Sequence, residues 1–205
     1  RGWLRGQARQ LRTGSPETFG RRVRSHLKDV PPPHVDRLLQ TIEHLSAQIS
    51  EADKELKAMA KQDAVCQRLM TVPGVGPVTA VRFAATLDEV ERFSNAHHVQ
   101  SYLGLVPGED SSSTRKRITS ITRAGSVKMR WSLVQAAWSA RRCRPFDPMV
   151  LWCMEVEKRR GKRIAVVALA RKMAGILYAI WRDGTTYDAR RLTGEVTTGN
   201  CTSPT

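Results

Sequence analysis

The amino-acid sequence predicts an all-α fold, and three observations support that prediction. Apolar residues follow a heptad spacing through one long segment and a helical period through most of the segments after it. Proline and glycine separate these segments at positions where helices begin and end. A single stretch, residues 107–126, has neither pattern and is an irregular loop rich in serine and arginine. Its alternating β-branched residues allow one short strand or hairpin there.

The first two segments differ in their patterns. Residues 1–31 are basic and polar with weak periodicity, and we interpret them as a linker: the end of an earlier helix, then a short loop around Gly14. Residues 32–64 are predicted to form one long coiled-coil helix. Its seven seam residues, spaced alternately four and three apart, are Leu38, Ile42, Leu45, Ile49, Ala52, Leu56 and Met59. The seam indicates a coiled coil, within the chain or between two copies, or else an amphipathic helix packed on a globular body.

Residues 65–190 are predicted to form a helical domain. We expect helices over residues 77–87, 97–105, 126–142, 147–160 and 162–182, with a polar loop at 88–95. The tryptophans fall mostly at the spacing of core residues, so we expect them to be mainly buried. Residues 191–205 are expected to be a disordered tail, because this end of the chain is rich in Thr, Gly, Ser and Pro.

The chain is strongly basic. Its 205 residues contain 34 Lys and Arg against 19 Asp and Glu, which gives a formal net charge of +15. Such an excess repels itself unless a polyanion offsets it, which favours nucleic acid as the partner. A membrane surface is disfavoured, because the cations are spread over folded segments and no run approaches the roughly 18 apolar residues of a membrane span. The four cysteines have no CxxC spacing, so we expect reduced thiols in a cytoplasmic protein.

The segment Val72–Pro77, with the sequence VPGVGP, has the character of a helix-hairpin-helix turn. Glycine lets the backbone approach a phosphate closely, and the free N–H groups at the start of the next helix favour an anion. The candidate nucleic-acid-binding residues here are Gly74, Val75, Gly76 and Thr79. The alternative is a plain helix–helix connection whose glycines serve only packing.

A second candidate site combines hydroxyl groups with cations. The run Ser111–Thr114 is followed directly by Arg115, Lys116 and Arg117, and the further candidate cations are Arg123, Lys128 and Arg130. A serine hydroxyl becomes a nucleophile when its proton is removed or its oxyanion is stabilised, and cations offset charge in phosphoryl transfer. The same residue types also form solvated phosphate-contact loops, so both interpretations stay open. The carboxylates predict no metal site, since no acidic tetrad sits on strand ends.

Several motifs follow one another in order between residues 69 and 137. They are Met70–Pro77, Arg92-Phe93, Tyr102–Pro107, Ser111-Ser112, Ile121–Gly125, Arg130 and Leu133. In this order and at these separations they resemble the C-terminal transposase domain of the IS110 insertion-sequence family. That family includes Piv-type DNA invertases and RNA-guided bridge recombinases. The resemblance spans most of residues 32–188, and the heptad helix is similar to the family's coiled-coil linker.

The resemblance implies a DNA transposase or site-specific recombinase that works through a covalent serine–DNA intermediate. The family's serine stands five residues after the proline of its Leu-Gly-Leu-x-Pro run, which is Ser112 here, and its implied role is that of nucleophile. The nearby cations, Arg115, Lys116, Arg117 and Arg123, would contact phosphate and, in RNA-guided members, guide RNA. The sequence departs from the family's pattern in two places: the residue after the serine is Ser113 where the family commonly has glycine, and later loop glycines are replaced by Thr119 and Ser120.

The resemblance also implies an N-terminal RuvC-like domain whose four acidic residues bind a divalent metal such as Mg²⁺. No such tetrad fits this sequence, which begins at Arg1, so we expect a piece of a longer protein, inactive alone and without a cofactor of its own. The expected partners are DNA, a guide RNA and a second copy bound through the coiled coil. Two other functions stay open: a non-catalytic DNA- or RNA-binding remnant of a transposase, and a coiled-coil interaction protein whose charge serves solubility.

Overall fold

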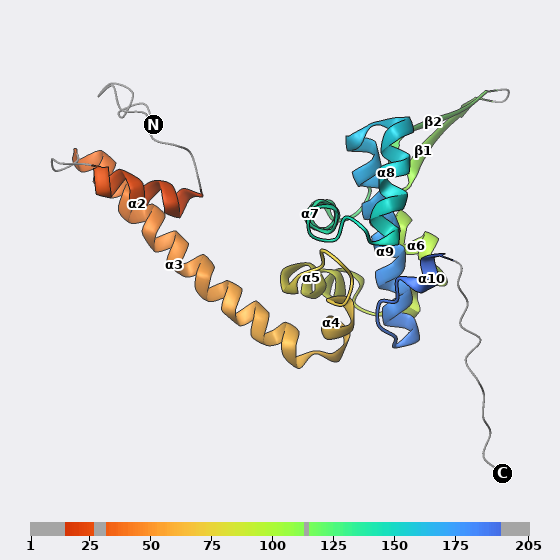
Figure 1. Ribbon diagram of the computed structural model, residues 1–205, viewed down its shortest axis with the longest axis horizontal. Helices are drawn as coiled ribbons and strands as arrows, with labels where there is room; N and C mark the ends of the chain where they lie inside the picture. The colour runs from red at the N-terminus through yellow and green to blue at the C-terminus, as the bar shows by residue number, and fades with distance from the viewer. Residues whose placement is uncertain (1–14, 27–31, 113–114, 194–205) are drawn as a thin grey trace, which may run out of the picture. The chain divides into compact units, whose positions relative to one another are not determined.

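The computed structural model describes residues 15–26, 32–112 and 115–193, and these are mainly helical, which confirms the all-α prediction. The chain divides into two compact units, Arg1–Glu55 and Leu56–Thr205. Helices α2 (Pro16–His26) and most of α3 (Pro33–Gln62) belong to the first unit. The remaining helices and a two-stranded hairpin belong to the second unit, which contains both candidate sites (Figure 1).

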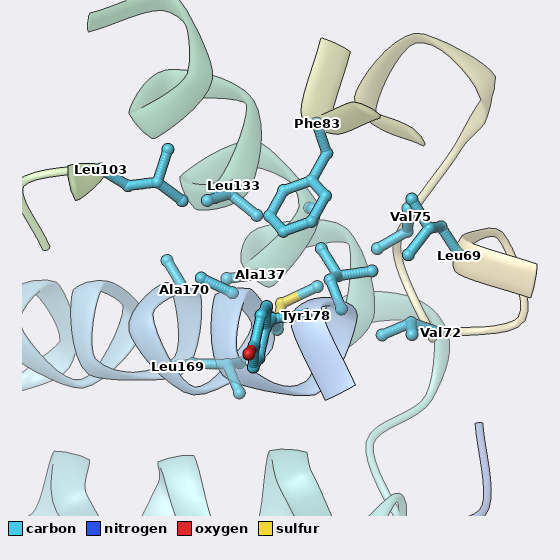
Figure 2. Packing of buried hydrophobic residues seen from close by; sticks show 14 of the residues in the cluster. Leu69, Val72, Val75, Phe83, Leu103, Leu133, Ala137, Leu169, Ala170 and Tyr178 are labelled. Atoms are coloured by element: carbon cyan, nitrogen blue, oxygen red, sulfur yellow. The ribbon is translucent and has the colours of Figure 1, made fainter. Parts of the chain in front are cut away.

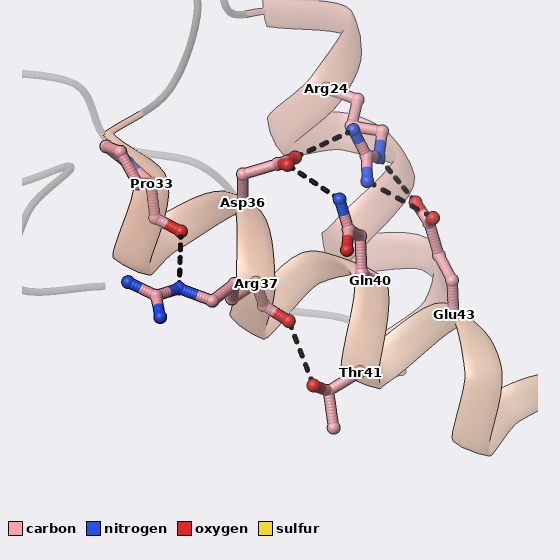
Figure 3. Close-up of polar contacts among 7 residues, drawn as sticks. All are labelled: Arg24, Pro33, Asp36, Arg37, Gln40, Thr41 and Glu43. Atoms are coloured by element: carbon pink, nitrogen blue, oxygen red, sulfur yellow. Dashed lines mark hydrogen bonds and ion pairs between the residues drawn. The ribbon is translucent and has the colours of Figure 1, made fainter.

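Helix α2 lies within the segment that the sequence analysis interprets as a linker. It begins at Pro16 because Ser15 caps it, with the Ser15 hydroxyl accepting the Thr18 N–H at 3.2 Å. Val23 and Leu39 are buried between α2 and α3. Arg24 of α2 forms a bidentate ion pair with Glu43 of α3, at 2.5 and 3.2 Å, and also reaches Asp36 (Figure 3). These contacts hold α2, whose packed face carries Phe19 and Val23 one helical turn apart.

The seam of α3 is largely uncovered. Leu38 is 63% exposed, Leu45 49% and Ile49 63%, whereas Leu39, outside the seam, is 3% exposed because it packs against α2. Helix α2 therefore covers Leu39 and reaches the seam at Ile42, which lies beside Gly20, and it leaves Leu38, Leu45 and Ile49 exposed. A stripe of large apolar side chains in water is typical of a surface that binds a partner.

The second unit is built around one long helix, α9 (Lys162–Asp183). The helices packed on it are α4 (Ala64–Leu69), α6 (Ala96–Tyr102), α7 (Val127–Cys143) and α8 (Pro148–Arg160). Helix α5 (Pro77–Leu87) packs on α4 and α7. Two short elements complete the unit: the 3₁₀ turn η1 (Val90–Arg92) and α10 (Arg190–Thr193). Side-chain caps on α4, α6, α7 and α8 fix where these helices begin.

The core of the second unit forms where α4, α5, α7 and α9 meet (Figure 2). Phe83, Leu133, Leu169 and Tyr178 are almost fully buried there, and each contributes about 1.5–3 kcal/mol by leaving water. The Tyr178 hydroxyl donates to the Phe93 carbonyl oxygen at 2.6 Å, which satisfies the one polar group of that side chain. Helix α9 is long and apolar enough to cross a membrane, but half of its most apolar window is buried in this core.

Residues 107–112 and 115–121 form the two strands of an antiparallel hairpin, one of the two forms that the sequence allowed. Strand β1 (Pro107–Ser112) pairs with β2 (Arg115–Ile121). The register pairs Ser112 with Arg115 at the far end and Pro107 with Ile121 at the near end, with a bulge between Pro107 and Glu109. The two strands extend away from the helices of the second unit (Figure 1).

Candidate nucleic-acid interface

Two glycines fix the place where the hairpin leaves the helical body. Gly104 has φ of 67°, and a Cβ there would lie 2.1 Å from the Ala124 carbonyl oxygen; Gly125 has φ of 71°, and its Cβ would lie 2.0 Å from the Tyr102 carbonyl oxygen. Only glycine allows two backbones to pass this closely in this conformation. We call this crossing of residues 102–105 and 122–125 the hairpin root. It explains locally why the Leu-Gly-Leu and Arg-Ala-Gly motifs both occur.

Arg130 of α7 supports the hairpin root from inside. Its side chain is buried, with 9% of the residue exposed, and its Nη1 donates to the carbonyl oxygens of Leu103, Ala124 and Gly125. These charge-assisted bonds join Leu103 on one segment of the root to Ala124 and Gly125 on the other. The sequence analysis placed Arg130 among the phosphate contacts; the structure instead gives it a supporting position, because the glycine crossing brings three carbonyl groups within its reach.

Two of the predicted cations are accessible beside the root. Arg123 is exposed and has φ of 58°, a left-handed conformation that is rare for residues other than glycine. Its N–H donates to the Gly104 carbonyl oxygen at 3.1 Å, so the crossing itself holds this conformation. Lys128 is exposed in the first turn of α7. Arg123 and Lys128 therefore form a cationic surface at the base of the hairpin.

The backbone of Ser112 and of the three cations at the start of β2 lies at the far end of the hairpin. Ser112 ends β1, and Arg115, Lys116 and Arg117 begin β2 opposite Ser112, Ser111 and Asp110. Their side chains, and the whole of residues 113 and 114, lie outside the described part of the chain. The backbone register thus brings the candidate nucleophile and the first candidate cation to the same rung of the ladder.

The Gly-rich turn divides into a packed part and an open part. A Cβ at Gly74 would lie 2.2 Å from the Ala136 carbonyl oxygen, so this glycine serves close packing against α7. Val75 is buried at 7% exposure, which removes its side chain from any surface contact. Gly76 has open space around it and precedes α5, where the first-turn N–H groups and Thr79 follow. Gly76 and Thr79 remain candidates, whereas Gly74 and Val75 support them.

A cavity of about 550 Å³ lies beside this turn. Its lining includes Val72–Gly76, Ser139 and Arg144, together with Tyr187 and Asp147. The Tyr187 hydroxyl donates to Asp147 at 2.7 Å, and burial together with that carboxylate raises the pKa of Tyr187. Gly74 packs against Ala140, twelve residues along α7 from Lys128. The turn and the hairpin root are therefore separate regions about 20 Å apart along α7.

The structure also shows surface residues that the sequence analysis did not single out. Trp131 is 61% exposed, contrary to the expected burial of the tryptophans. The buried residues Met129 and Leu133 flank it, and a helix turns about 200° over two residues, so Trp131 faces outward. Arg160, Arg163 and Arg171 gather beside the hairpin root although they come from two helices. The helix break at Gly161 was the only sequence signal that brings the first two together.

The described residues contain no group of three or more His, Cys, Asp or Glu side chains placed to hold a metal ion. The thiols of Cys66 and Cys153 are buried in the core, and burial raises the pKa of both.

Comparison with known proteins identifies relatives for this arrangement. Residues 66–148 match the transposase IS116/IS110/IS902 family. The chain is 34% identical over 141 residues to the transposase of insertion sequence element IS1111A from Coxiella burnetii, covering 68% of this chain and 39% of that protein. It is 32% identical over 151 residues to a probable family 20 transposase of Pseudomonas aeruginosa, covering 73% and 44%. The chain thus spans less than half the length of these curated relatives.

Proposed function

Because the chain belongs to the IS116/IS110/IS902 family of transposases, we propose that it is the serine-bearing part of a DNA transposase or site-specific recombinase. The observation that carries the proposal is the hairpin root. A pair of interlocked glycines and a buried arginine give a two-stranded hairpin a rigid base, and Ser112 stands at the end of its first strand. Rigid support of a reacting group is what positional catalysis requires.

In the proposed reaction the Ser112 hydroxyl attacks a phosphodiester of DNA. A bond forms between Oγ and phosphorus, a bond from phosphorus to one sugar oxygen breaks, and the serine proton leaves as the departing oxygen gains one. The cations Arg115, Lys116 and Arg117 offset the negative charge that builds up on the phosphoryl oxygens. The covalent strand is then passed to a second DNA end by the reverse step.

The proposed DNA surface has two parts. Arg123 and Lys128 are exposed at the hairpin root, where they can bind phosphate and, in an RNA-guided system, guide RNA. Gly76 and Thr79 form the open part of the Gly-rich turn, where the start of α5 favours an anion. The net charge of +15 supports binding that weakens steeply with salt.

We also propose that the α3 seam pairs with a second copy of the chain. Leu38, Leu45 and Ile49 are exposed at heptad spacing, which suits the knobs-into-holes packing of a two-stranded coil. Mg²⁺ is assigned in this proposal to the RuvC-like domain that the family resemblance implies. The described residues do not form a metal-binding cluster, and no step above passes through a metal.

The proposal is tested by joining this chain to a RuvC-like half from a family member and supplying Mg²⁺, guide RNA and donor DNA. Mass spectrometry should find nucleotide attached to Ser112, and Ser112→Ala should remove the adduct while DNA affinity changes less than about twofold. Ser111→Ala is the matched control and should keep both properties. An adduct on a neighbouring serine would reassign the nucleophile.

Two further outcomes would contradict the catalytic proposal. Salt-sensitive DNA binding without any adduct, in an assay where the parental family enzyme forms one, would leave a non-catalytic binding remnant. Absence of salt-sensitive binding to nucleic acid would favour an interaction protein.

A further inference from the structure

A second cavity, of about 490 Å³, lies between the hairpin root and the first half of α9. We call it the slot. Its floor is apolar and includes Leu105, Ile121, Val167 and Ala168. Leu105 is fully buried, whereas Ile164 is 56% exposed at the rim, so the slot opens to solvent along one side. Its volume lies within the roughly 300–1,000 Å³ typical of small-ligand sites.

The rim of the slot is cationic. Three arginines are among its lining residues, Arg160, Arg163 and Arg171, and its lining contains no carboxylate among the described residues. Arg171 donates through Nε to Gln100 Oε1 at 2.8 Å, which holds it in place. Within the described part of the chain, Arg160 and Arg163 have no carboxylate partner, so their charges are available to a ligand.

The start of α9 adds to this positive field. Gly161 precedes the helix and provides no side-chain cap, which leaves the first N–H groups of a 22-residue helix without a side-chain acceptor. The positive end of the helix dipole therefore lies beside Arg160 and Arg163. The apolar floor is complementary to the face of a planar, weakly polar ring. The positive charge beside it is complementary to anionic groups on either side of that ring.

We propose that the slot binds the base of one unpaired DNA nucleotide, with Arg160 and Arg163 on its flanking phosphates. This inference rests on the proposed function, because it assigns the slot to the DNA strand on which Ser112 acts. A paired base is stacked inside the duplex and cannot lie on the slot floor, so the nucleotide must be unpaired. An uncharged peptide segment would cover the floor but would leave the guanidinium charges without counterions. Arginine planes and apolar side chains also suit a base face.

The position of the slot supports the same occupant. Pro107 and Ile121 line the slot and also form the first pair of the hairpin ladder. Ser112 lies five residues along β1 from Pro107, a span of about 17 Å at the rise of an extended strand. A DNA strand held in the slot could therefore follow the hairpin to the candidate nucleophile. Holding one unpaired nucleotide at the root would fix the register of that strand.

The test measures binding of this chain to three labelled DNA probes by fluorescence anisotropy: a duplex with one unpaired thymidine, the same duplex with an abasic residue there, and a perfect duplex. Wild-type protein should bind the thymidine bulge about five- to a hundredfold more tightly than the abasic bulge, the range that base stacking gives. Ala168→Trp fills the slot without changing charge, and should bring this ratio close to one while perfect-duplex affinity changes less than about twofold.

Two more variants separate the base contact from the charge. Ile164→Glu alters an exposed rim residue, so folding is preserved, and it should also abolish the ratio. Arg163→Gln should weaken all three probes and reduce the salt slope by about one. Arg142→Gln, an exposed arginine at the end of α7, is the matched control and should leave the ratio unchanged.

The outcomes distinguish this inference from the proposed function. A wild-type ratio near one, or a ratio that persists in both Ala168→Trp and Ile164→Glu, with perfect-duplex binding retained, would overturn the slot assignment and leave DNA binding intact; the slot would then be a protein-binding surface. Failure of all three probes to bind would overturn both. A bulge preference that is lost only in the slot variants supports the proposal.

Discussion

Replacing Gly104 with alanine tests the hairpin root directly, because the chain provides a matched control at Gly184. The two glycines have nearly the same backbone conformation, with φ of 67° and 65°. A Cβ at Gly104 would lie 2.1 Å from the Ala124 carbonyl oxygen and 2.4 Å from the Ala124 nitrogen, whereas a Cβ at Gly184 would meet nothing within 4 Å. The left-handed conformation costs alanine about 1–2 kcal/mol at both positions, so this contribution cancels.

The difference in free energy of unfolding between the two variants then measures only the effect of the close approach between the Gly104 and Ala124 backbones. Carbon atoms need about 3.5 Å from their neighbours, so the two backbones would have to separate by more than 1 Å at Gly104. Overpacking of this kind costs about 1–3 kcal/mol, and loss of the 3.1 Å bond from the Arg123 N–H to the Gly104 carbonyl oxygen adds about 1 kcal/mol. We therefore expect Gly104→Ala to lose about 2–4 kcal/mol more stability than Gly184→Ala.

The assay is guanidinium denaturation of both variants, followed by circular dichroism and tryptophan fluorescence. The Gly104→Ala variant should show a lower midpoint than the Gly184→Ala variant and, in the complemented recombinase, a reduced yield of the serine–DNA adduct. Equal losses of stability in the two variants, within about 0.5 kcal/mol, would refute the argument that the root depends on this close approach.

Three further predictions concern Arg130 at the hairpin root, the buried thiol of Cys66, and Leu45 in the α3 seam. Arg130→Met removes the donor to three carbonyl oxygens of the hairpin root and should lower the free energy of unfolding by about 2–4 kcal/mol, against less than about 0.5 kcal/mol for the exposed Arg142→Met; similar losses would contradict the supporting role. Burial raises the pKa of the Cys66 thiol from 9.0 to about 11, so the stability from its bound proton is complete below pH 9 and is lost as the pH rises through 11. Urea denaturation between pH 9 and 11 should show that the free energy of unfolding falls by up to about 3 kcal/mol less in Cys66→Ala than in the wild-type protein. Parallel pH profiles of the two proteins would argue against burial of the thiol. Leu45→Lys should lower the mass measured by light scattering without unfolding the chain, while Gln48→Lys, an equal charge change outside the seam, should not; an unchanged mass for Leu45→Lys would argue against pairing through the seam.

The helices of the second unit could be predicted from the sequence because their ends carry strong local signals. Pro77 begins α5, and Gly161 separates α8 from α9 close to the expected boundaries. Helix α2 was not predicted, because few apolar side chains join it to α3 and its main polar contact is the ion pair of Arg24 with Glu43. The ion pair joins residues 19 positions apart and gives no local signal, and the apolar spacing of Phe19 and Val23 extends over a single turn.

The sequence predicted which residue types form the candidate sites, but it did not predict which of those residues are exposed and which are buried. Arg123 and Arg130 are both arginines and lie seven positions apart, yet Arg123 is exposed whereas Arg130 is buried among carbonyl groups. Gly74 and Gly76 are two positions apart, yet only Gly74 lies against another backbone. Each difference depends on which distant segment packs nearby, and this is a property of the tertiary structure. The cluster of Arg160, Arg163 and Arg171 has the same origin.

The hairpin root also determines which parts of this protein can change independently. Residues 102–105 and 122–125 must change together, because a side chain added to either glycine would collide with the other segment. Strands β1 and β2 lie beyond this crossing, and Pro107, Ser120 and Ile121 at their near ends line the slot beside α9. Mutations in this protein should therefore fall into two groups: changes at the crossing disturb the packing of the helical body, whereas changes further along the strands act on the reaction proposed for Ser112.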